Sequence, residues 1–408
     1  MDRPLSNRIA CAYGVGDAGG VNTVPDISLA AQEAPRDRVA QRLYRGALLW
    51  TWRRLYFGAV RVYGRLPGEP GTLYLSTHRN GGIDGAIAQQ AVEESPVPVA
   101  ASHITRSFWG RWTGCIEVVR ATDRERHGHG DAARDPLADA LARLAAGESL
   151  MWFPEGTSDG GPKLLPVKRG TARLLTAAVE RGMPVRVVVM GLHYQAMDAL
   201  QSQVEVEVAK PANMQPSEVA IIAAEVRTDE IQRRIETALR TLSIEYPDVE
   251  TQAAIETLTA GLGLPIIRAR RALLRVPLPK LQQWSQRVQA ASRFPPIQAW
   301  PWLLPWIVAA SIWLPTLIVA YGITRPADRN NKAFIRSLLA MLLIPFNLAL
   351  SSWILAMIGL SWLFAAPLAA LSLPLGLVAH RHLREARSRT RALRTLRDEI
   401  ASQGVTDA

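Results

Sequence analysis

The sequence predicts an α/β domain followed by an α-helical membrane region. Strand and helix patterns alternate through most of residues 65–281, which is typical of an α/β domain. Residues 337–379 contain no ionisable side chain, and residues 294–324 contain none except Tyr321. Runs of this length belong in a bilayer. We therefore expect a soluble or peripheral domain and, after it, a membrane region.

Short apolar runs predict five buried strands. These are Gly71–Ser76, Pro98–Ser102, Ile116–Val119, Leu150–Phe153 and Pro184–Met190. Helical patterns lie between them at Ile83–Glu94, Asp135–Ala146 and Lys168–Arg181. The domain and a helical extension are expected to occupy residues 65–281.

The segments before this domain are of two kinds. Residues 1–37 are polar and lack the apolar stretch of a secretory signal, so we expect a disordered N-terminus. Residues 38–64 mix arginines with aromatic side chains, which predicts a basic aromatic helix lying on a membrane surface. A solvent-facing helix packed on the domain remains an equal alternative.

The long apolar run predicts a two-span hairpin. As a helix, residues 337–379 would extend about 64 Å, about twice the thickness of a hydrocarbon core. We expect the two spans to meet near residues 359–361. Residues 294–324 contain five prolines and four tryptophans, which predicts a re-entrant or kinked membrane segment.

Basic residues flank every apolar run and predict the orientation. They are Arg287 and Arg293 before the first run, Arg325, Arg329, Lys332 and Arg336 between the runs, and seven arginines from Arg381 to Arg397. Basic flanks favour the cytoplasmic side. A re-entrant segment followed by a hairpin places all of them there, whereas three full crossings would not. Residues 380–408 are then a basic cytoplasmic tail.

One candidate catalytic pair follows the first strand of the domain. His78 and Asp84 are six positions apart, at a strand-to-helix turn that contains Gly81 and Gly82. A histidine suits proton abstraction near neutral pH, and a carboxylate on its other ring nitrogen fixes the tautomer. The glycines let the backbone turn sharply so that the two side chains can meet. A histidine beside a helix-capping aspartate is the less specific alternative.

A second motif makes the interpretation more specific. Phe153-Pro-Glu-Gly-Thr157 follows another buried strand and continues to Pro166-Val-Lys-Arg-Gly170. Together with His78 and Asp84, this motif resembles the glycerolipid acyltransferase family, which makes phosphatidic acid and repairs lysophospholipids. Gly114–Arg120 and Pro184–Gly191 resemble two further blocks of the family. The resemblance covers about residues 71–194 and implies a mixed sheet flanked by helices.

The resemblance also implies roles for single residues. His78 would be the general base that deprotonates the acceptor hydroxyl, and Asp84 would orient it. Arg120 would hold the acceptor phosphate, while Glu155, Gly156 and Thr157 would shape the acceptor side of the cleft. A membrane-bound acyl transfer from acyl-CoA or acyl carrier protein to glycerol 3-phosphate or a lysophospholipid follows, without a metal or further cofactor.

Two departures from the family pattern leave the acceptor open. Five residues separate His78 from Asp84, where four are usual; this spacing resembles a subgroup with membrane spans after the catalytic domain. Ser158 stands where the common form has a phosphate-binding arginine. Lys163 and Lys168 could compensate, although a surface role is the commoner one for such lysines. The acceptor could therefore be another hydroxylated or glycosylated membrane lipid.

The net charge of +11 predicts an anionic partner. Membrane lipid is favoured over nucleic acid, because the basic tail follows a membrane span directly and no groove-reading motif occurs. We therefore expect an integral protein of the cytoplasmic membrane, with its catalytic domain on the cytoplasmic face. A catalytically silent lysolipid-binding protein remains the alternative from a different class. Oligomeric state, acyl chain length and acylated position are not specified by the sequence.

Overall fold

The computed structural model describes residues 56–403 with gaps at 66–67, 93–94, 102–104, 106–113, 119–134 and 293–295, together with residues 40, 43, 46, 47 and 50. Within this part, seven strands form one mixed sheet in the order β1-β7-β6-β2-β5-β3-β4. The strands are β1 Phe57–Tyr63, β2 Thr72–Ser76, β3 Val97–Ala101, β4 Ile116–Val118, β5 Leu150–Trp152, β6 Arg186–Tyr194 and β7 Ser202–Ala209. β6 and β7 are antiparallel, and the other neighbouring pairs are parallel. The predicted α/β fold with a mixed sheet is confirmed.

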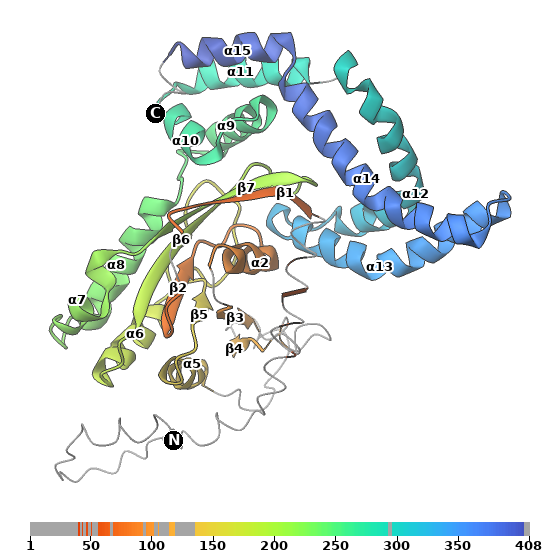
Figure 1. Cartoon of the computed structure of the whole chain (residues 1–408). Helices are drawn as coiled ribbons and strands as arrows, with labels where there is room; N and C mark the ends of the chain where they lie inside the picture. The colour runs from red at the N-terminus through yellow and green to blue at the C-terminus, as the bar shows by residue number, and fades with distance from the viewer. Residues whose placement is uncertain are drawn as a thin grey trace, which may run out of the picture.

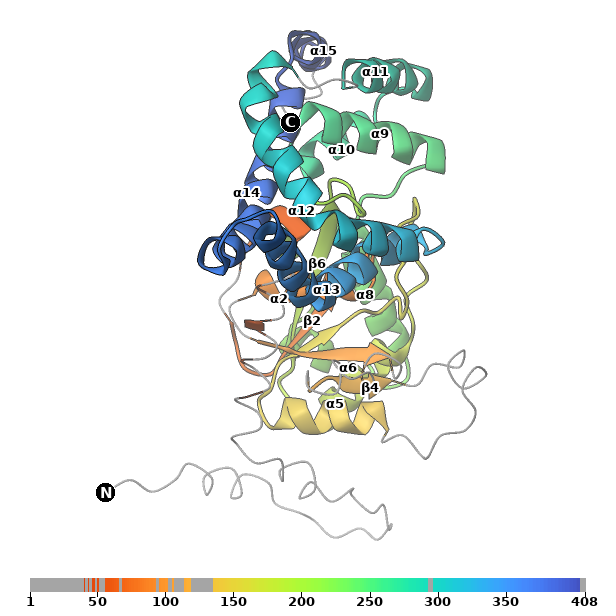
Figure 2. The same ribbon diagram turned by 90° about the vertical axis from the view of Figure 1, so that its right-hand side faces the viewer.

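Helices cover both faces of this sheet because its strands alternate their side chains (Figures 1 and 2). Leu73 and Leu75 of β2 pack into one core with α5 (Pro136–Ala145), α6 (Gly170–Glu180) and α8 (Arg227–Leu242). Tyr74, between them, belongs to the opposite core with α2 (Gly82–Gln90). Two short helices, η4 (Ala212–Met214) and α7 (Pro216–Ala220), connect β7 to α8. The alternation of side chains along β2 therefore places Leu73 and Leu75 against one layer of helices and Tyr74 against the layer that contains α2.

A helical layer follows the sheet and has its own core. It contains α9 (Val249–Leu262), α10 (Ile266–Leu273), α11 (Leu278–Ala291) and, from the end of the chain, α15 (Arg391–Ala401). Trp284 is fully buried there, and its Nε1 donates to Glu399 Oε1 at 2.9 Å. This contact joins α11 to α15. The helical layer therefore contains both the helix that precedes the apolar helices in sequence and the helix that follows them.

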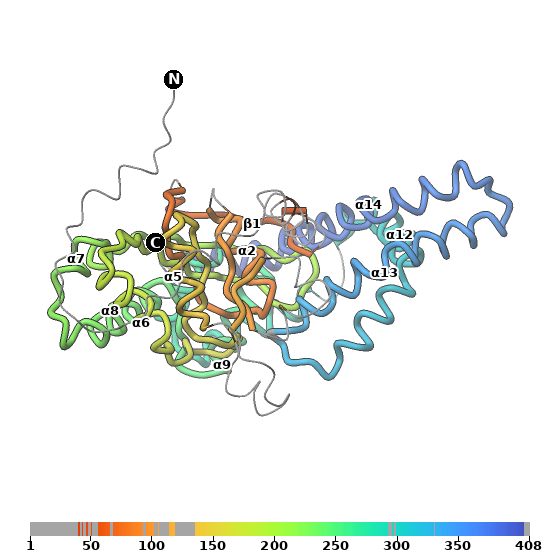
Figure 3. Tube along the Cα trace, turned by 90° about the horizontal axis from the view of Figure 1, so that it is seen from below, coloured from red at the N-terminus to blue at the C-terminus, as the bar shows by residue number. Residues whose placement is uncertain are grey.

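In the part of the chain that the structure describes, three helices are long and apolar enough to cross a membrane. They are α12 (Trp300–Thr324), preceded by η5 (Ile297–Ala299), α13 (Arg329–Met357) and α14 (Trp362–Ser388). Large apolar side chains on them are exposed, such as Leu363 at 83 % and Phe346 at 73 %. α13 and α14 meet at residues 358–361, close to the turn expected from sequence, and extend away from the sheet (Figure 3).

The structure corrects one expectation and adds two features. Residues 57–63 form β1, an edge strand parallel to β7, so the predicted helix over residues 38–64 is wrong there. Gly58 and the alternating Val60 and Val62 suit a strand better than a helix. The strand β7 was not predicted, and β6 continues four residues beyond the predicted strand end, to Tyr194. The expectation for residues 1–37 lies outside the described residues.

Candidate active site

His78 and Asp84 lie against each other at the carboxyl end of β2. His78 is the second residue after this strand, and Asp84 lies in the first turn of α2. His78 Nδ1 is 2.8 Å from Asp84 Oδ2. Gly81 has a φ of +56°, in the left-handed region that glycine adopts without strain, so the chain can turn back on itself here. The contact makes Nδ1 the protonated nitrogen of a neutral imidazole and leaves Nε2 as the basic one.

The carboxylate of Asp84 is fully buried and accepts three hydrogen bonds. Besides His78 Nδ1, the backbone N–H of Asn80 donates to Oδ2 at 2.6 Å. The hydroxyl of Tyr194, at the end of β6, donates to Oδ1. Three donors satisfy a carboxylate that burial would otherwise penalise strongly. Asp84 is thereby held in one orientation toward the imidazole.

Glu155 supports the histidine from the backbone side. It is fully buried, and its Oε1 accepts the backbone N–H of His78 at 2.7 Å while Oε2 accepts that of Leu165 at 3.0 Å. Burial raises the pKa of the Glu155 carboxyl above its ordinary value, and the two amide hydrogen bonds and nearby Arg79 oppose the rise. Glu155, which belongs to the second motif, therefore holds the backbone of His78 in the first motif by a hydrogen bond.

Further contacts tie the two motifs into one unit. The ring of Phe153 stacks on the imidazole of His78, with centroids 4.4 Å apart. The carbonyl of His78 accepts the backbone N–H of Asp159 at 3.0 Å. Arg79 is buried and donates through one terminal nitrogen to the carbonyls of Gly161 and Lys163, each at 3.0 Å. The loop after β5 therefore closes over the turn that carries His78.

The other residues expected at the site have mixed positions. Gly156 has a φ of +73° and lies beside Lys168, whose Cγ would be 3.4 Å from an added Cβ. Thr157, Lys163 and Lys168 are exposed. Arg120 lies outside the described residues. The structure thus brings His78, Asp84 and Glu155 into contact and leaves the lysines on the surface nearby.

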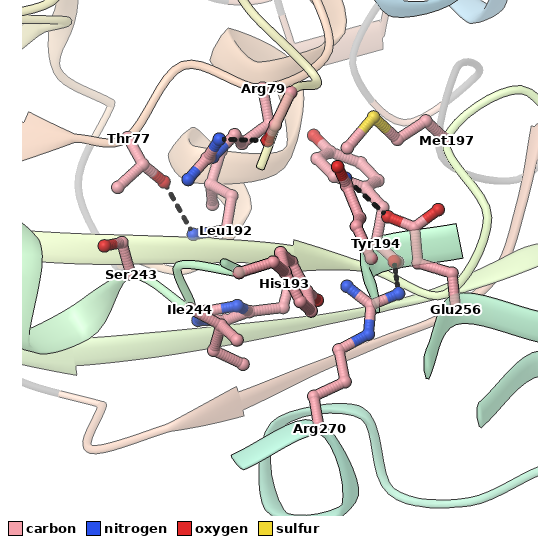
Figure 4. A pocket seen from close by; sticks show the side chains of 13 residues that line it. Thr77, Arg79, Leu192, His193, Tyr194, Met197, Ser243, Ile244, Glu256 and Arg270 are labelled. Carbon is pink, nitrogen blue, oxygen red and sulfur yellow. Dashed lines mark hydrogen bonds between the residues drawn. The ribbon is translucent and has the colours of Figure 1, made fainter. Parts of the chain in front are cut away.

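A small polar pocket lies between β6 and the helical layer (Figure 4). Thr77, Arg79, His193, Tyr194 and Arg270 are among its lining residues. Burial and, as a smaller cause, the neighbouring charge of Arg270 together lower the pKa of His193 to about 3. His193 is therefore neutral at physiological pH. His78 does not line this pocket, so the pocket does not present substrate to the imidazole.

Two residues with direct contacts to Asp84 were missed in the sequence. Asn80 lies inside the first motif, and its role depends on a backbone N–H that no residue type reveals. Tyr194 is 110 positions from Asp84. A signal existed, because Tyr194 has the same parity along β6 as Val188, Met190 and Leu192, which face α2. The strand predicted from sequence ended at Met190, four residues before Tyr194, so this alternation was not applied to Tyr194.

Comparison with known proteins adds a family to this geometry. Residues 59–193 match the family model described as Acyltransferase. An uncharacterized acyltransferase of Schizosaccharomyces pombe is 28 % identical over 119 residues, covering 28 % of this chain and 18 % of that protein. Glycerol-3-phosphate O-acyltransferase 2 of Saccharomyces cerevisiae is 28 % identical over 145 residues, covering 33 % of this chain and 18 % of that protein. The aligned region thus spans less than a fifth of the length of these relatives.

Among solved structures, the crystal structure of the 1-acyl-sn-glycerophosphate (LPA) acyltransferase PlsC from Thermotoga maritima is similar over 53 % of this chain and 85 % of its own. The sequence identity is 16 % and the TM-score 0.34. The family match and the relatives define residues 59–193 as an acyltransferase domain. This match agrees with the resemblance to the glycerolipid acyltransferase family that the motifs of the chain carry.

Proposed function

We propose that this protein is a membrane-bound O-acyltransferase of glycerolipid synthesis or remodelling. It transfers a fatty acyl group from acyl-CoA or acyl carrier protein to a hydroxyl of glycerol 3-phosphate or a lysophospholipid. The observation that carries the proposal is the 2.8 Å contact between His78 Nδ1 and Asp84 Oδ2, inside the acyltransferase domain. The family match supports the reaction class, and the chemistry of the pair supports the roles.

The geometry supports a simple reaction sequence. His78 Nε2 removes the proton of the acceptor hydroxyl, and Asp84 stabilises the imidazolium through Nδ1. The acceptor oxygen attacks the thioester carbonyl, a new C–O bond forms, and the C–S bond breaks. The proton on His78 then passes to the departing thiolate, which leaves as a thiol. The thioester is already activated, so the residues named here need supply only the base and its orientation.

The acceptor phosphate is proposed to bind at the exposed side of the second motif. Lys163 and Lys168 are exposed there, and Arg120 is proposed to act with them on the grounds of the family resemblance. Ser158 replaces the arginine of the common family motif. This replacement favours, as a second candidate, another hydroxylated or glycosylated membrane lipid as the acceptor. A panel of acceptors separates the two.

We further propose that the domain faces the cytoplasm at the cytoplasmic membrane. The three apolar helices support membrane association. The N-terminal end of α13 contacts α2, the helix that carries Asp84, and Ala333 is buried in the same core as Ile83. A lipid acceptor and its product could therefore remain in the membrane while the hydroxyl reaches His78.

The test is acyl transfer by membranes that contain the wild-type protein or His78→Ala. Labelled acyl-CoA, or acyl carrier protein charged with the same chain, is supplied with glycerol 3-phosphate, lysophosphatidate or neutral lysolipids. Loss of a positioned general base typically costs about 10²- to 10⁴-fold, so His78→Ala should lose at least 100-fold in kcat. Asp84→Asn should lose most of its activity, because the amide cannot hold the same tautomer.

The control for loss of an imidazole is His129→Ala, in the polar, glycine-containing sequence His127-Gly-His-Gly130. It should transfer acyl groups at the wild-type rate. Substantial transfer by a folded, membrane-bound His78→Ala protein would overturn the base assignment. No transfer by the wild-type protein to any acceptor, while lysolipid still binds, would instead favour a non-catalytic lysolipid-binding protein.

A further inference from the structure

Three arginines on the apolar helices hold one loop of the acyltransferase domain. The loop, residues 195–201, joins β6 to β7 and is named here the β6–β7 loop. Arg336 of α13 donates to the carbonyl of Asp198 at 2.8 Å. Arg384 of α14 donates to the carbonyl of Leu200 at 3.2 Å and to Gln195 Oε1 at 2.9 Å. Arg381 donates to Gln201 Oε1 at 3.1 Å. We call these three residues the arginine clamp.

The clamped loop is in direct contact with the residues that hold Asp84. The carbonyl of Met197, in the middle of the loop, accepts a hydrogen bond from Asn80 Nδ2 at 3.0 Å. The backbone N–H of the same asparagine donates to Asp84 at 2.6 Å. Tyr194, whose hydroxyl donates to the other oxygen of Asp84, immediately precedes the loop. Both non-histidine donors to Asp84 are therefore placed by this loop or by its first neighbour.

A second contact joins the same two parts of the molecule. Phe334, one turn into α13, covers Gly82 in the first turn of α2, two residues before Asp84. A Cβ added to Gly82 would lie 2.7 Å from the ring of Phe334. Only a residue without a side chain permits this approach. The helix that carries Asp84 is thus packed directly on the start of the apolar hairpin.

Arg336 and Arg384 belong to the basic residues that flank the apolar helices. Their contacts with the β6–β7 loop indicate a structural role in addition to orientation of the protein in the membrane. Arginines that bind anionic headgroups direct their guanidinium groups to lipid phosphates. Arg336 and Arg384 instead donate to carbonyls of the acyltransferase domain, and Arg336 also lies 4.0 Å over the ring of Tyr321 on α12. Donation from a charged group to a fixed carbonyl is directional, so it specifies where the loop lies.

We propose that Arg336 and Arg384 are positioning residues for the reaction. By holding the β6–β7 loop against the hairpin, they fix Asn80 and Tyr194 and so orient Asp84 toward His78. The dyad is then correctly assembled only when α13 and α14 are seated on the domain. This inference rests on the proposed acyl transfer, and it names residues that act on the site from the membrane region.

The first test is the double variant Arg336→Gln with Arg384→Gln. A small displacement of a catalytic group costs about tenfold to a hundredfold in rate, so kcat should fall at least tenfold while KM stays within about twofold. Deuterium uptake by residues 76–90 and 195–201 should rise. The matched control is Arg389→Gln with Arg391→Gln, which removes two positive charges from the same end of the hairpin. Arg389 pairs with Glu385 one turn earlier.

The second test exploits the close approach of Phe334. Gly82→Ala replaces a helical glycine, which by itself favours the helix, so a loss of activity must come from the collision with the ring. We expect kcat to fall in Gly82→Ala and to recover at least threefold in Gly82→Ala with Phe334→Ala. Such a recovery would show that activity was lost because the added methyl group displaced α2 from Phe334, and not because the protein failed to fold.

The outcomes for the two proposals are distinguishable. Wild-type kcat together with unchanged deuterium uptake in the clamp variant overturns the inference while leaving the acyl transfer intact. An inactive wild-type protein overturns the proposed function, and deuterium uptake then still reports whether the clamp orders residues 76–90. An equal loss of kcat in the Arg389 and Arg391 control also overturns the inference, because charge alone would then be responsible.

Discussion

Buried charged side chains around the candidate dyad bind mainly to backbone groups. Glu155 accepts two backbone amides, and Arg79 donates to backbone carbonyls. Arg270 is buried as well and donates to the carbonyl of Tyr194 at 2.6 Å. A desolvated charge is costly unless hydrogen bonds replace its water. These residues consequently fix the backbone on either side of His78 and Tyr194.

His193 predicts a pH effect on stability. Its pKa is lowered from 6.5 to about 3 in the folded protein, chiefly by burial. Between about pH 6.5 and pH 3 the unfolded chain therefore takes up a proton that the folded protein does not. The contribution of His193 is present above pH 6.5 and is lost as the pH falls, by up to about 1.4 kcal/mol per pH unit.

We expect His193→Gln to remove this dependence. The measurement is the thermal unfolding midpoint of the detergent-solubilised protein between pH 4 and pH 8. The wild-type midpoint should decline more steeply on acidification than that of the variant. Parallel declines in the two proteins would show that His193 becomes protonated in the folded state. His129→Ala serves as the comparison for loss of a titrating imidazole elsewhere.

The predictability of single residues from sequence depended on distance along the chain. His78 and Asp84 lie within one strand-to-helix turn, so residue types and spacing were sufficient to bring them together. The second motif was predicted to share the cleft, and Glu155 does contact the backbone of His78. Asn80 could not be assigned in this way because it binds Asp84 through its backbone N–H. Tyr194 could not be assigned because its contact depends on the register of β6 beside β2.

At the scale of elements, α12 is bent within the hairpin of α13 and α14 (Figure 2). Near its start, Trp302 stacks on His382 at 4.2 Å, and at its end Thr324 accepts from Arg336 Nε at 3.0 Å. Both partners lie at the end of the hairpin nearest the domain. The centre of α12 reaches farther toward the tip, where Trp313 Nε1 donates to Ser372 at 2.8 Å. The two ends of α12 therefore lie on the same side.

Pro315 explains this bend, and Asn347 stabilises it. A proline within a helix removes one backbone hydrogen bond and disturbs the preceding turn, leaving carbonyls to be satisfied by other donors. The carbonyl of Ile312 accepts from Asn347 Nδ2 at 3.2 Å and from Ser351 Oγ at 3.2 Å. Asn347 Oδ1 in turn accepts from Thr316 at 3.0 Å. One polar side chain thus binds both sides of the bend.

Asn347→Leu should loosen α12 in the hairpin. The variant loses the bonds of Asn347 to Ile312 and Thr316, and polar contacts between membrane helices are worth about 0.6 to 2 kcal/mol. We expect a lower thermal unfolding midpoint in detergent and faster proteolysis between α12 and α13. Asn331→Leu, in the first turn of α13, is the control for loss of an amide. An unchanged midpoint in Asn347→Leu would show that Ser351 alone satisfies the bend.

Several elements were predictable because their signals are local. The charge-free runs, the prolines of residues 294–324 and the apolar strands all act within a short window of sequence. β1 was mistaken for part of a helix because its arginine and aromatic residues suggested a membrane surface, whereas its pairing with β7 involves residues about 145 positions away. β7 alternates charged and apolar residues, and it was missed because its pairing, too, is non-local.

At the scale of the whole molecule, the bend of α12 supports a proposed membrane topology. Because both its ends lie beside the domain, we propose that α12 enters the apolar layer and returns, while α13 and α14 cross it as a hairpin. This arrangement places all three basic flanks on the side of the acyltransferase domain. It accords with the preference of basic flanks for the cytoplasm, whereas three crossings would not.

Cysteine labelling tests this topology. In a background with Cys11→Ser and Cys115→Ser, single cysteines are introduced by Glu225→Cys in the domain, Ile297→Cys, Asp328→Cys and Ile358→Cys at the hairpin tip. A membrane-impermeant maleimide should label the first three from the same side of sealed vesicles and Ile358→Cys from the other. Labelling of Ile297→Cys and Asp328→Cys from opposite sides would mean that α12 crosses the membrane.

The arginine clamp has a consequence for synthesis of the protein. Arg384 and its partner Gln195 are 189 residues apart, and the ribosome makes the loop long before it makes the helix. The acyltransferase domain can therefore emerge from the ribosome without the supports that orient its aspartate. Those supports are completed only when the hairpin has been inserted into the bilayer. Under the proposed positioning role of Arg336 and Arg384, a nascent or mislocalised domain would therefore transfer few acyl groups until the hairpin is seated on it.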